Sequence, residues 1–458
     1  MSVPNRYRFA SARLPDGWKR DVVITIRSGL ITEVIAGDST SEVHAIAGAA
    51  IPGMPNVHSH AFQRAMAGLA ESRSTRAGST QADSFWTWRE TMYTLAQRIT
   101  PESLNAIAAQ LYVEMLKAGY TRVCEFHYLH NQPDGSRYAE RAVMSQALLD
   151  AAATAGIGMT LLPTLYQTSD FGGAPPTARQ RQFVLTSDEL IQLLESLRSA
   201  AGDAVIGTAL HSLRAVPPAA LAEVIGASAV RNSPVHIHIA EQQREVQECV
   251  RALQRRPVEW LLGHAPVDER WCLVHVTHAS SEELHGVAQT GAVIGLCPTT
   301  EANLGDGSFD VPAYFALDGR IGIGSDSHIS INAAEELRWL EYQSRLSRRE
   351  RNVLATTEQS TGARLWNAAG IAGSQAAGIS AGAIEKGHRA DIVVLDTQSP
   401  ALVGRTEDAL LDTFVFSGQP NPIREVMVNG RWIVQDGLHF AEIPIAASYR
   451  KAMRTLFA

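Results

Sequence analysis

The feature that most constrains the fold of this chain is a repeated alternation of short apolar runs with longer segments of helical periodicity. Segments 102–119, 141–156 and 187–201 carry apolar residues three to four positions apart, as amphipathic helices do. Such alternation predicts βα units and a parallel sheet. The apolar runs that read as strands number eight, which favours a closed (β/α)₈ TIM-like barrel over an open sheet. They are residues 49–60, 121–130, 158–167, 204–213, 234–241, 271–278, 292–298 and 320–328.

The two ends of the chain have a different character. Residues 7–50, 387–396 and 424–437 read as short strands and turns without intervening helices. We therefore expect an α/β protein in which a small β-sandwich domain is formed from both chain ends. Residues 1–50 and 376–458 would supply that domain, the second with a terminal helix, and residues 51–375 would form the barrel.

Composition excludes several classes of partner. The chain of 458 residues has a net charge of −7 and is 45% hydrophobic, so nothing indicates a surface for nucleic acid or anionic membrane. No secretory leader or apolar run of membrane-spanning length is evident. The cysteines lack metal-ribbon or disulfide spacing, which favours a reducing compartment; they are Cys124, Cys249, Cys272 and Cys297. We expect a cytoplasmic protein with a small-molecule substrate.

Histidines and a carboxylate end three of the predicted strands. His58 and His60 alternate on the first strand, so both side chains point to one side. His238 lies on the fifth strand and Asp326 follows the eighth, at the end where such barrels carry their active sites. Three imidazoles and one carboxylate leave room for water, as catalytic zinc requires. Iron or manganese accepts the same donors.

Two further residues suit proton transfer beside such an ion. Glu241 follows the fifth strand and His275 ends the sixth. Zinc lowers the pKa of a bound water, Asp326 and His275 are suited to accept its proton, and Glu241 is suited to protonate a departing nitrogen. Either Glu241 or His275 could instead only orient a metal ligand.

Several motifs together resemble a known family. The chain resembles the amidohydrolase superfamily over essentially its whole length, and within it most closely the formiminoglutamate deiminases of histidine degradation. The segments that carry the resemblance are PGMPNVHSHAFQRAMAG, FWTWRE, CEFHYLH, HSLRAV, HIHIAEQ, LVHVTH, CPTTEANLGDG and GIGSDSH. It implies hydrolysis of N-formimino-L-glutamate to N-formyl-L-glutamate and ammonia by a homodimer. It also implies that the zinc ligands are His58, His60, His238 and Asp326.

The shortage of lysine bears on the number of ions. Relatives with two metals bridge them through a carboxylated lysine at the end of the fourth strand, whereas the segment 206–216 has none. We therefore expect one ion per chain.

The resemblance also implies a substrate that carries carboxylates. The residues that would hold it are Gln63, Arg89, Tyr128, His211 and Arg214. Guanidinium groups bind carboxylates through two parallel hydrogen bonds, and a tyrosine can add a donor. The long connection 61–100, which includes Arg89, would be either a lid over the site or a surface excursion.

Two other functions remain open at this point. One is a mononuclear-zinc deaminase acting on a purine, pterin or triazine ring, which would need an apolar or aromatic pocket. The other is a non-catalytic scaffold. Some conspicuous residues are expected to be structural: His236 either facing outward or packing within the barrel, Trp86 and Trp88 in lid packing, and 305–307 in a turn. Roles next to the site stay open for His127, His130, His278 and His328.

Overall fold

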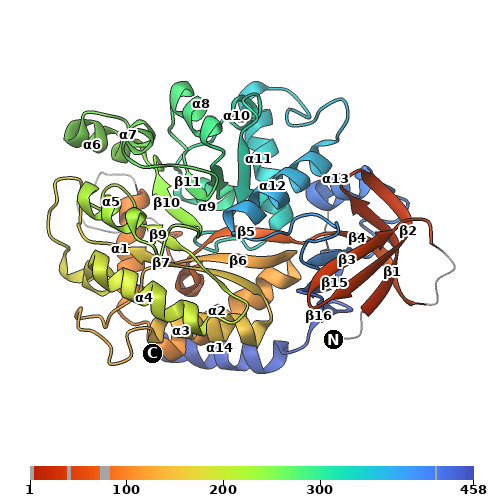
Figure 1. The fold of residues 1–458 in the computed structure, drawn as a ribbon, viewed down its shortest axis with the longest axis horizontal. Coiled ribbons are helices and arrows are strands. Elements are labelled where there is room, and N and C mark those ends of the chain that lie inside the picture. Colours follow the sequence, from red (N-terminus) through yellow and green to blue (C-terminus); the bar gives the residue numbers. More distant parts are fainter. Residues whose placement is uncertain (1–4, 39–42, 73–82, 418–419) are drawn as a thin grey trace.

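The computed structural model describes residues 5–38, 43–72, 83–417 and 420–458, and it contains a barrel with a separate sheet at one side (Figure 1). Parallel strands pair in order around the barrel, which closes where β13 pairs with β5. The fourth barrel strand is split at Gly207 into β8 and β9. The barrel strands are β5 (Met54–Ser59), β6 (Tyr120–His127), β7 (Gly158–Leu165), β8 (Val205–Ile206), β9 (Thr208–Leu210), β10 (Val235–Ile239), β11 (Trp271–His275), β12 (Val293–Leu296) and β13 (Arg320–Ile323). The predicted eightfold barrel is confirmed.

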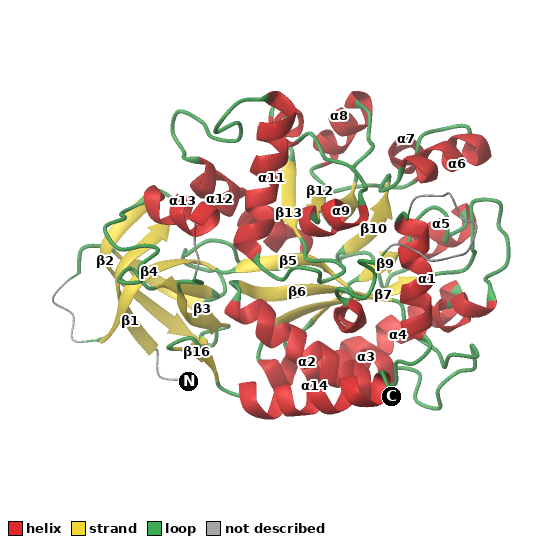
Figure 2. Cartoon of the chain, turned by 180° about the vertical axis from the view of Figure 1, so that it is seen from behind, coloured by secondary structure: helices red, strands yellow, loops and turns green. Residues whose placement is uncertain are grey.

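Helices connect the strands and cover the barrel (Figure 2). Local signals fix their ends: Thr100 accepts a hydrogen bond from the backbone of Ser103 at the start of α2, and Gly156 ends α3 with a φ of 76°. The helices are α1 (Phe85–Ala96), α2 (Pro101–Lys117), α3 (Val143–Ala155), α4 (Ser187–Ala200), α5 (Pro218–Gly226), α6 (Gln243–Leu253), α7 (Pro257–His264), α8 (Ser281–Thr290), α9 (Pro298–Leu304), α10 (Val311–Phe315), α11 (Ala333–Arg348), α12 (Thr361–Ala376), α13 (Asp408–Ser417) and α14 (Glu442–Leu456), with 3₁₀ turns η1 (Ala61–Met66) and η2 (Ala178–Phe183). None of these described helices has the length and apolar character needed to cross a membrane.

The second sheet is built from both ends of the chain, as predicted. Strand β4 pairs in parallel with β1 and antiparallel with β14, and so joins the two halves. A buried core that includes Phe9, Ile24 and Met427 stabilises this sheet. Its strands are β1 (Asn5–Leu14), β2 (Gly17–Arg27), β3 (Leu30–Ile35), β4 (His44–Pro52), β14 (Ile392–Leu395), β15 (Ile423–Val428), β16 (Arg431–Gln435) and β17 (Leu438–His439).

Helix α12 fills the end of the barrel from which the strands start. It packs against β5, β12 and β13, and its Ala372 and Ala376 join a buried cluster with Val57 and Val293. Small side chains on α12 allow this close approach. The opposite end, where the strands finish, is thereby left to carry polar groups.

Candidate active site

Four predicted metal ligands converge at the carboxyl ends of the strands. The Nε2 atom of His238 lies 3.0 Å from that of His58 and 3.3 Å from that of His60. The Oδ1 atom of Asp326 lies 3.4 Å from His58 Nε2 and 3.5 Å from His60 Nε2. All four side chains are buried. The structure thus brings together the complete set that the sequence indicated.

The protonation state of these histidines leaves nitrogen lone pairs available to bind a cation. His60 Nδ1 donates to the carbonyl of Phe126 at 2.8 Å, and His238 Nδ1 donates to the carbonyl of His211 at 2.8 Å. Each Nε2 therefore carries a lone pair. Burial lowers the pKa of all three imidazoles, which keeps them neutral. Lone pairs facing one another at about 3 Å repel unless a cation lies between them, so this donor set fits a divalent metal ion.

The backbone around these ligands is strained and held in place. Asp326 has a φ of 46°, and His275 has a φ of 72°, both in the left-handed region that non-glycine residues avoid. The Asp326 amide donates to the His58 carbonyl at 3.0 Å, and the His60 amide donates to the Asp326 carbonyl at 3.2 Å. These bonds join the ends of β5 and β13, which fixes the carboxylate beside the imidazoles.

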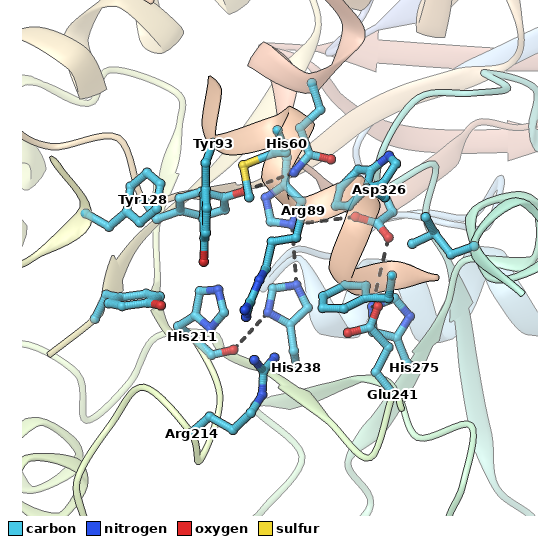
Figure 3. Close-up of a pocket in the computed structure, with 17 residues that line it drawn as sticks. His60, Arg89, Tyr93, Tyr128, His211, Arg214, His238, Glu241, His275 and Asp326 are labelled. Carbon is cyan, nitrogen blue, oxygen red and sulfur yellow. Dashed lines mark hydrogen bonds and ion pairs between the residues drawn. The ribbon is translucent and has the colours of Figure 1, made fainter. Parts of the chain in front are cut away.

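Glu241 and His275 lie next to the ligand set, as predicted (Figure 3). The Nε2 atom of His275 is 3.7 Å from Glu241 Oε1 and 3.9 Å from Asp326 Oδ2. Burial raises the pKa of Glu241 to about 7. Burial alone would lower the pKa of His275, but the carboxylates of Glu241, Glu301 and Asp326 together raise it to about 10. A bound cation would lower both pKa values by repulsion of the proton.

All five residues expected at the substrate line one cavity with the metal-facing groups. Gln63 Nε2 donates to the hydroxyl of Tyr128 at 2.9 Å, and the ring of His211 packs edge-on against Tyr128 and Tyr166. Helix α1 contributes Arg89 to the lining, so the described part of the long connection lies at the site. Residues 73–82 of that connection lie outside the described residues.

Two arginines reach into this cavity, and no carboxylate among the residues that the structure describes forms an ion pair with either of them. Arg89 and Arg214 point toward one another from different elements (Figure 3). The Nε atom of each is buried and has no hydrogen-bond partner within the described structure. Neither guanidinium forms an ion pair with a described acidic residue. Because a buried guanidinium nitrogen without a hydrogen-bond partner is costly, this arrangement suits an anionic ligand.

The remaining histidines divide into structural and supporting groups. His236 bonds the carbonyl of Ala376 through Nε2 at 2.9 Å, on the side of α12, which agrees with the expected packing role. His328 lies between the hydroxyls of Ser59 and Ser325, so it supports the strand ends that carry the ligands. His278 bonds the carbonyl of Asp306. The rings of His127 and His130 pack against each other outside the ligand set.

Sequence reasoning missed a carboxylate behind His275. Glu301, on α9, is buried and its Oε1 lies 3.3 Å from His275 Nδ1. The same oxygen accepts the amide of Cys297 at 2.9 Å. Glu301 follows the seventh strand directly, in CPTTE, and this position could have identified it as a residue near the site. Asp306, within the expected turn, is also buried and accepts a hydrogen bond from Gln242.

Comparisons with known proteins find a family model, a curated relative and solved structures that are similar to this chain. A model described as "Amidohydrolase family" matches residues 49–433. The chain is 49% identical to a formimidoylglutamate deiminase of Pseudomonas aeruginosa, over 97% of this chain and 98% of that protein. A solved amidohydrolase from Brucella melitensis superposes with a TM-score of 0.93 at 43% identity, over 99% and 100% of the two chains. An adenosine deaminase from Xanthomonas campestris with bound zinc shares the fold, with a TM-score of 0.82 at 18% identity over 99% and 98%.

Proposed function

This chain belongs to the amidohydrolase family, an enzyme family of metal-dependent hydrolases, and from that premise we propose that it is a zinc-dependent formimidoylglutamate deiminase. It would hydrolyse N-formimino-L-glutamate to N-formyl-L-glutamate and ammonia. Family membership also confirms the predicted class, a hydrolase that acts on carbon–nitrogen bonds.

The observation that carries the substrate assignment is the pair of unpaired arginines beside the metal-facing set. Arg89 and Arg214 lie in the cavity that also contains Glu241, His275 and Asp326. Glutamate brings two carboxylates, and each can accept parallel hydrogen bonds from a guanidinium. Gln63, Tyr128 and His211 line the same cavity and would complete the binding site. The relative that is 49% identical and named for this activity supports the same substrate.

The donor set would hold one zinc ion, through His58, His60, His238 and Asp326. When bound, zinc supplies Lewis acidity and lowers the pKa of a coordinated water. The proton transfers are carried out by residues of the chain. Glu241 accepts a proton from the attacking water and delivers it to the terminal nitrogen, and the second proton of the water passes to the same nitrogen by the same carboxylate as the carbonyl forms. The water oxygen becomes the formyl oxygen, the bond between the formimino carbon and the terminal nitrogen breaks, and ammonia leaves.

His275 and Asp326 would assist this transfer. His275, held by Glu301 from behind, faces both Glu241 and Asp326 with its Nε2 atom. A positively charged imidazole there stabilises negative charge that develops on the attacked group. Asp326 would accept a hydrogen bond from the attacking water and so fix its direction.

A ring deaminase is the second candidate, because the adenosine deaminase from Xanthomonas campestris shares the fold. A purine or triazine needs an apolar or amide-lined pocket instead of two unpaired guanidinium groups. The cavity does contain aromatic residues, among them Phe85, Trp88 and Phe183. The two candidates differ in whether charge on the ligand is required.

The test compares substrates directly. Purified enzyme is incubated with N-formimino-L-glutamate, and separately with adenosine, guanine and cytosine, while ammonia is measured. We expect ammonia and N-formyl-L-glutamate from the first and none from the rings. Efficient deamination of a ring with formiminoglutamate left intact would overturn the proposed substrate. A homodimeric assembly and a cytoplasmic location stay predictions.

A further inference from the structure

A single tryptophan on α1 contacts three arginines. The guanidinium carbon of Arg89 lies 4.3 Å from the centroid of the Trp86 ring, that of Arg214 lies 5.6 Å away, and that of Arg244 lies 4.4 Å away. Each distance falls within the range in which an indole attracts a cation. These arginines come from three places in the chain, namely α1, the turn after β9 and the start of α6.

The three arginines differ in their other partners. Arg244 is exposed and pairs with Glu248 at 2.6 Å, so its charge is already neutralised. Arg89 and Arg214 have no ion pair within the described structure, and the Nε atom of each is buried. The face of the indole therefore contacts both charges, and the carboxylates of Glu245 and Glu241 also act electrostatically on Arg214.

Local geometry explains how Trp86 reaches both arginines. Trp86 and Arg89 are three residues apart on α1, so their side chains share one face of the helix. Arg214 lies in the turn after β9, so its contact with Trp86 connects α1 to the end of the barrel where the strands finish. Arg244 lies three residues after Glu241, and its contact with Trp86 ties the same indole to the segment that carries the acid–base group.

We propose that Trp86 is a positioning residue, which fixes the guanidinium groups of Arg89 and Arg214 so that they grip the carboxylates of the substrate. The inference rests on the proposed function, since it concerns the same substrate. Trp86 does not line the cavity that Trp88 and Arg89 line, so it acts through the arginines and not by contact with the ligand. An indole face this close to two guanidinium groups limits the rotamers open to both, which reduces the entropy lost on binding.

Positioning of the arginines and simple packing of α1 predict different effects of substitution. A packing residue would be replaceable by any apolar side chain of similar size. A residue that works through its ring face requires an aromatic replacement. Trp86→Phe and Trp86→Leu are therefore the informative pair. Trp339→Leu, on an exposed part of α11 distant in sequence from the site, provides the matched control for loss of a tryptophan.

The experiment is steady-state kinetics on N-formimino-L-glutamate with metal content measured for every variant. In Trp86→Leu we expect KM to rise about 5- to 30-fold, the scale of one or two lost cation–π contacts, while kcat changes less than about 3-fold. Trp86→Phe should recover most of the loss, and Trp339→Leu should match the wild type. Competition adds a second measurement: inhibition by glutarate should weaken in Trp86→Leu, whereas inhibition by the uncharged glutaramide should not.

The outcomes separate this inference from the one on which it rests. Wild-type turnover of formiminoglutamate with an unchanged KM in Trp86→Leu would overturn the role of Trp86 alone. Equal weakening of glutarate and glutaramide, or a leucine variant that matches the phenylalanine variant, would show that the residue only packs the lid. Absence of wild-type turnover would overturn the proposed function and, with it, this inference.

Discussion

Replacement of Glu241 by glutamine isolates proton transfer from metal binding. The Oε1 atom of Glu241 lies 3.7 Å from the Nε2 atom of His275. Glu241 is not one of the four proposed zinc ligands. Glutamine keeps the volume and one acceptor oxygen, but it cannot accept the proton of water. Burial raises the pKa of Glu241 in spite of the attraction to His275, so the ionised side chain carries a desolvation cost that glutamine lacks, and the variant should fold at least as stably as the wild type.

The expected loss of turnover is about 10²- to 10⁴-fold, the usual scale of general acid–base catalysis. In free energy this raises the barrier by about 3–5 kcal/mol. Ammonia release measures turnover, elemental analysis measures the metal, and thermal unfolding checks the fold. Turnover within about 10-fold of the wild type, with metal retained, would remove Glu241 from the mechanism.

The pH profile gives an independent check on the same residue. Burial, opposed by His275 and reinforced by the charge of Asp326, raises the pKa of Glu241 to about 7. The ionised form, which accepts the proton, is present above that pKa and lost as the pH falls through it. We expect kcat/KM to decline on the acidic side with a midpoint at or below pH 7, because a bound cation lowers it further. If the residual activity of Glu241→Gln still declined on the acidic side with the same midpoint, the decline would belong to another group.

Three further perturbations address the metal and the substrate. Arg214→Ala should lower kcat/KM for formiminoglutamate about 10- to 150-fold, with unchanged metal content, because a charge-assisted contact of roughly 1.5–3 kcal/mol is lost; an unchanged value would exclude Arg214 from binding. Chelation should remove about one ion per chain and abolish turnover, which zinc should restore; two ions bridged in the barrel would contradict the one-ion prediction. His238→Asn should lose the metal, whereas His236→Asn should keep it and lower the free energy of unfolding by about 1–3 kcal/mol, because only a buried hydrogen bond to Ala376 is lost. Metal loss in both would refute the distinction between them.

The pair His236 and His238 shows which part of the site could be predicted from the sequence. Residues two apart on a strand point to the same side, so the alternation on β10 places both side chains on one face and cannot say which of them reaches the metal-facing groups. The strand register decides it, since His238 lies near the carboxyl end of β10 beside Val274 and His275, whereas His236 lies deeper beside Cys272. The position along the strand, toward its carboxyl end, was the usable signal.

Other features depended on contacts between distant segments. Trp86 reads in the sequence as lid packing, because nothing in FWTWRE predicts that Arg214 and Arg244 meet the same indole. Glu301 stands 26 residues from its partner His275, and only the closed barrel brings α9 behind β11. The ligand set was predictable for the opposite reason: each member ends a strand, and parallel strands finish at one edge.

The most direct measurement of the central claim is the identity of the products formed from N-formimino-L-glutamate by the metal-loaded enzyme. We predict one ammonia and one N-formyl-L-glutamate for each substrate consumed, because water attacks the formimino carbon and the terminal nitrogen departs. Release of formamide and glutamate would instead mean that the other carbon–nitrogen bond breaks, and it would contradict the placement of the leaving nitrogen beside Glu241.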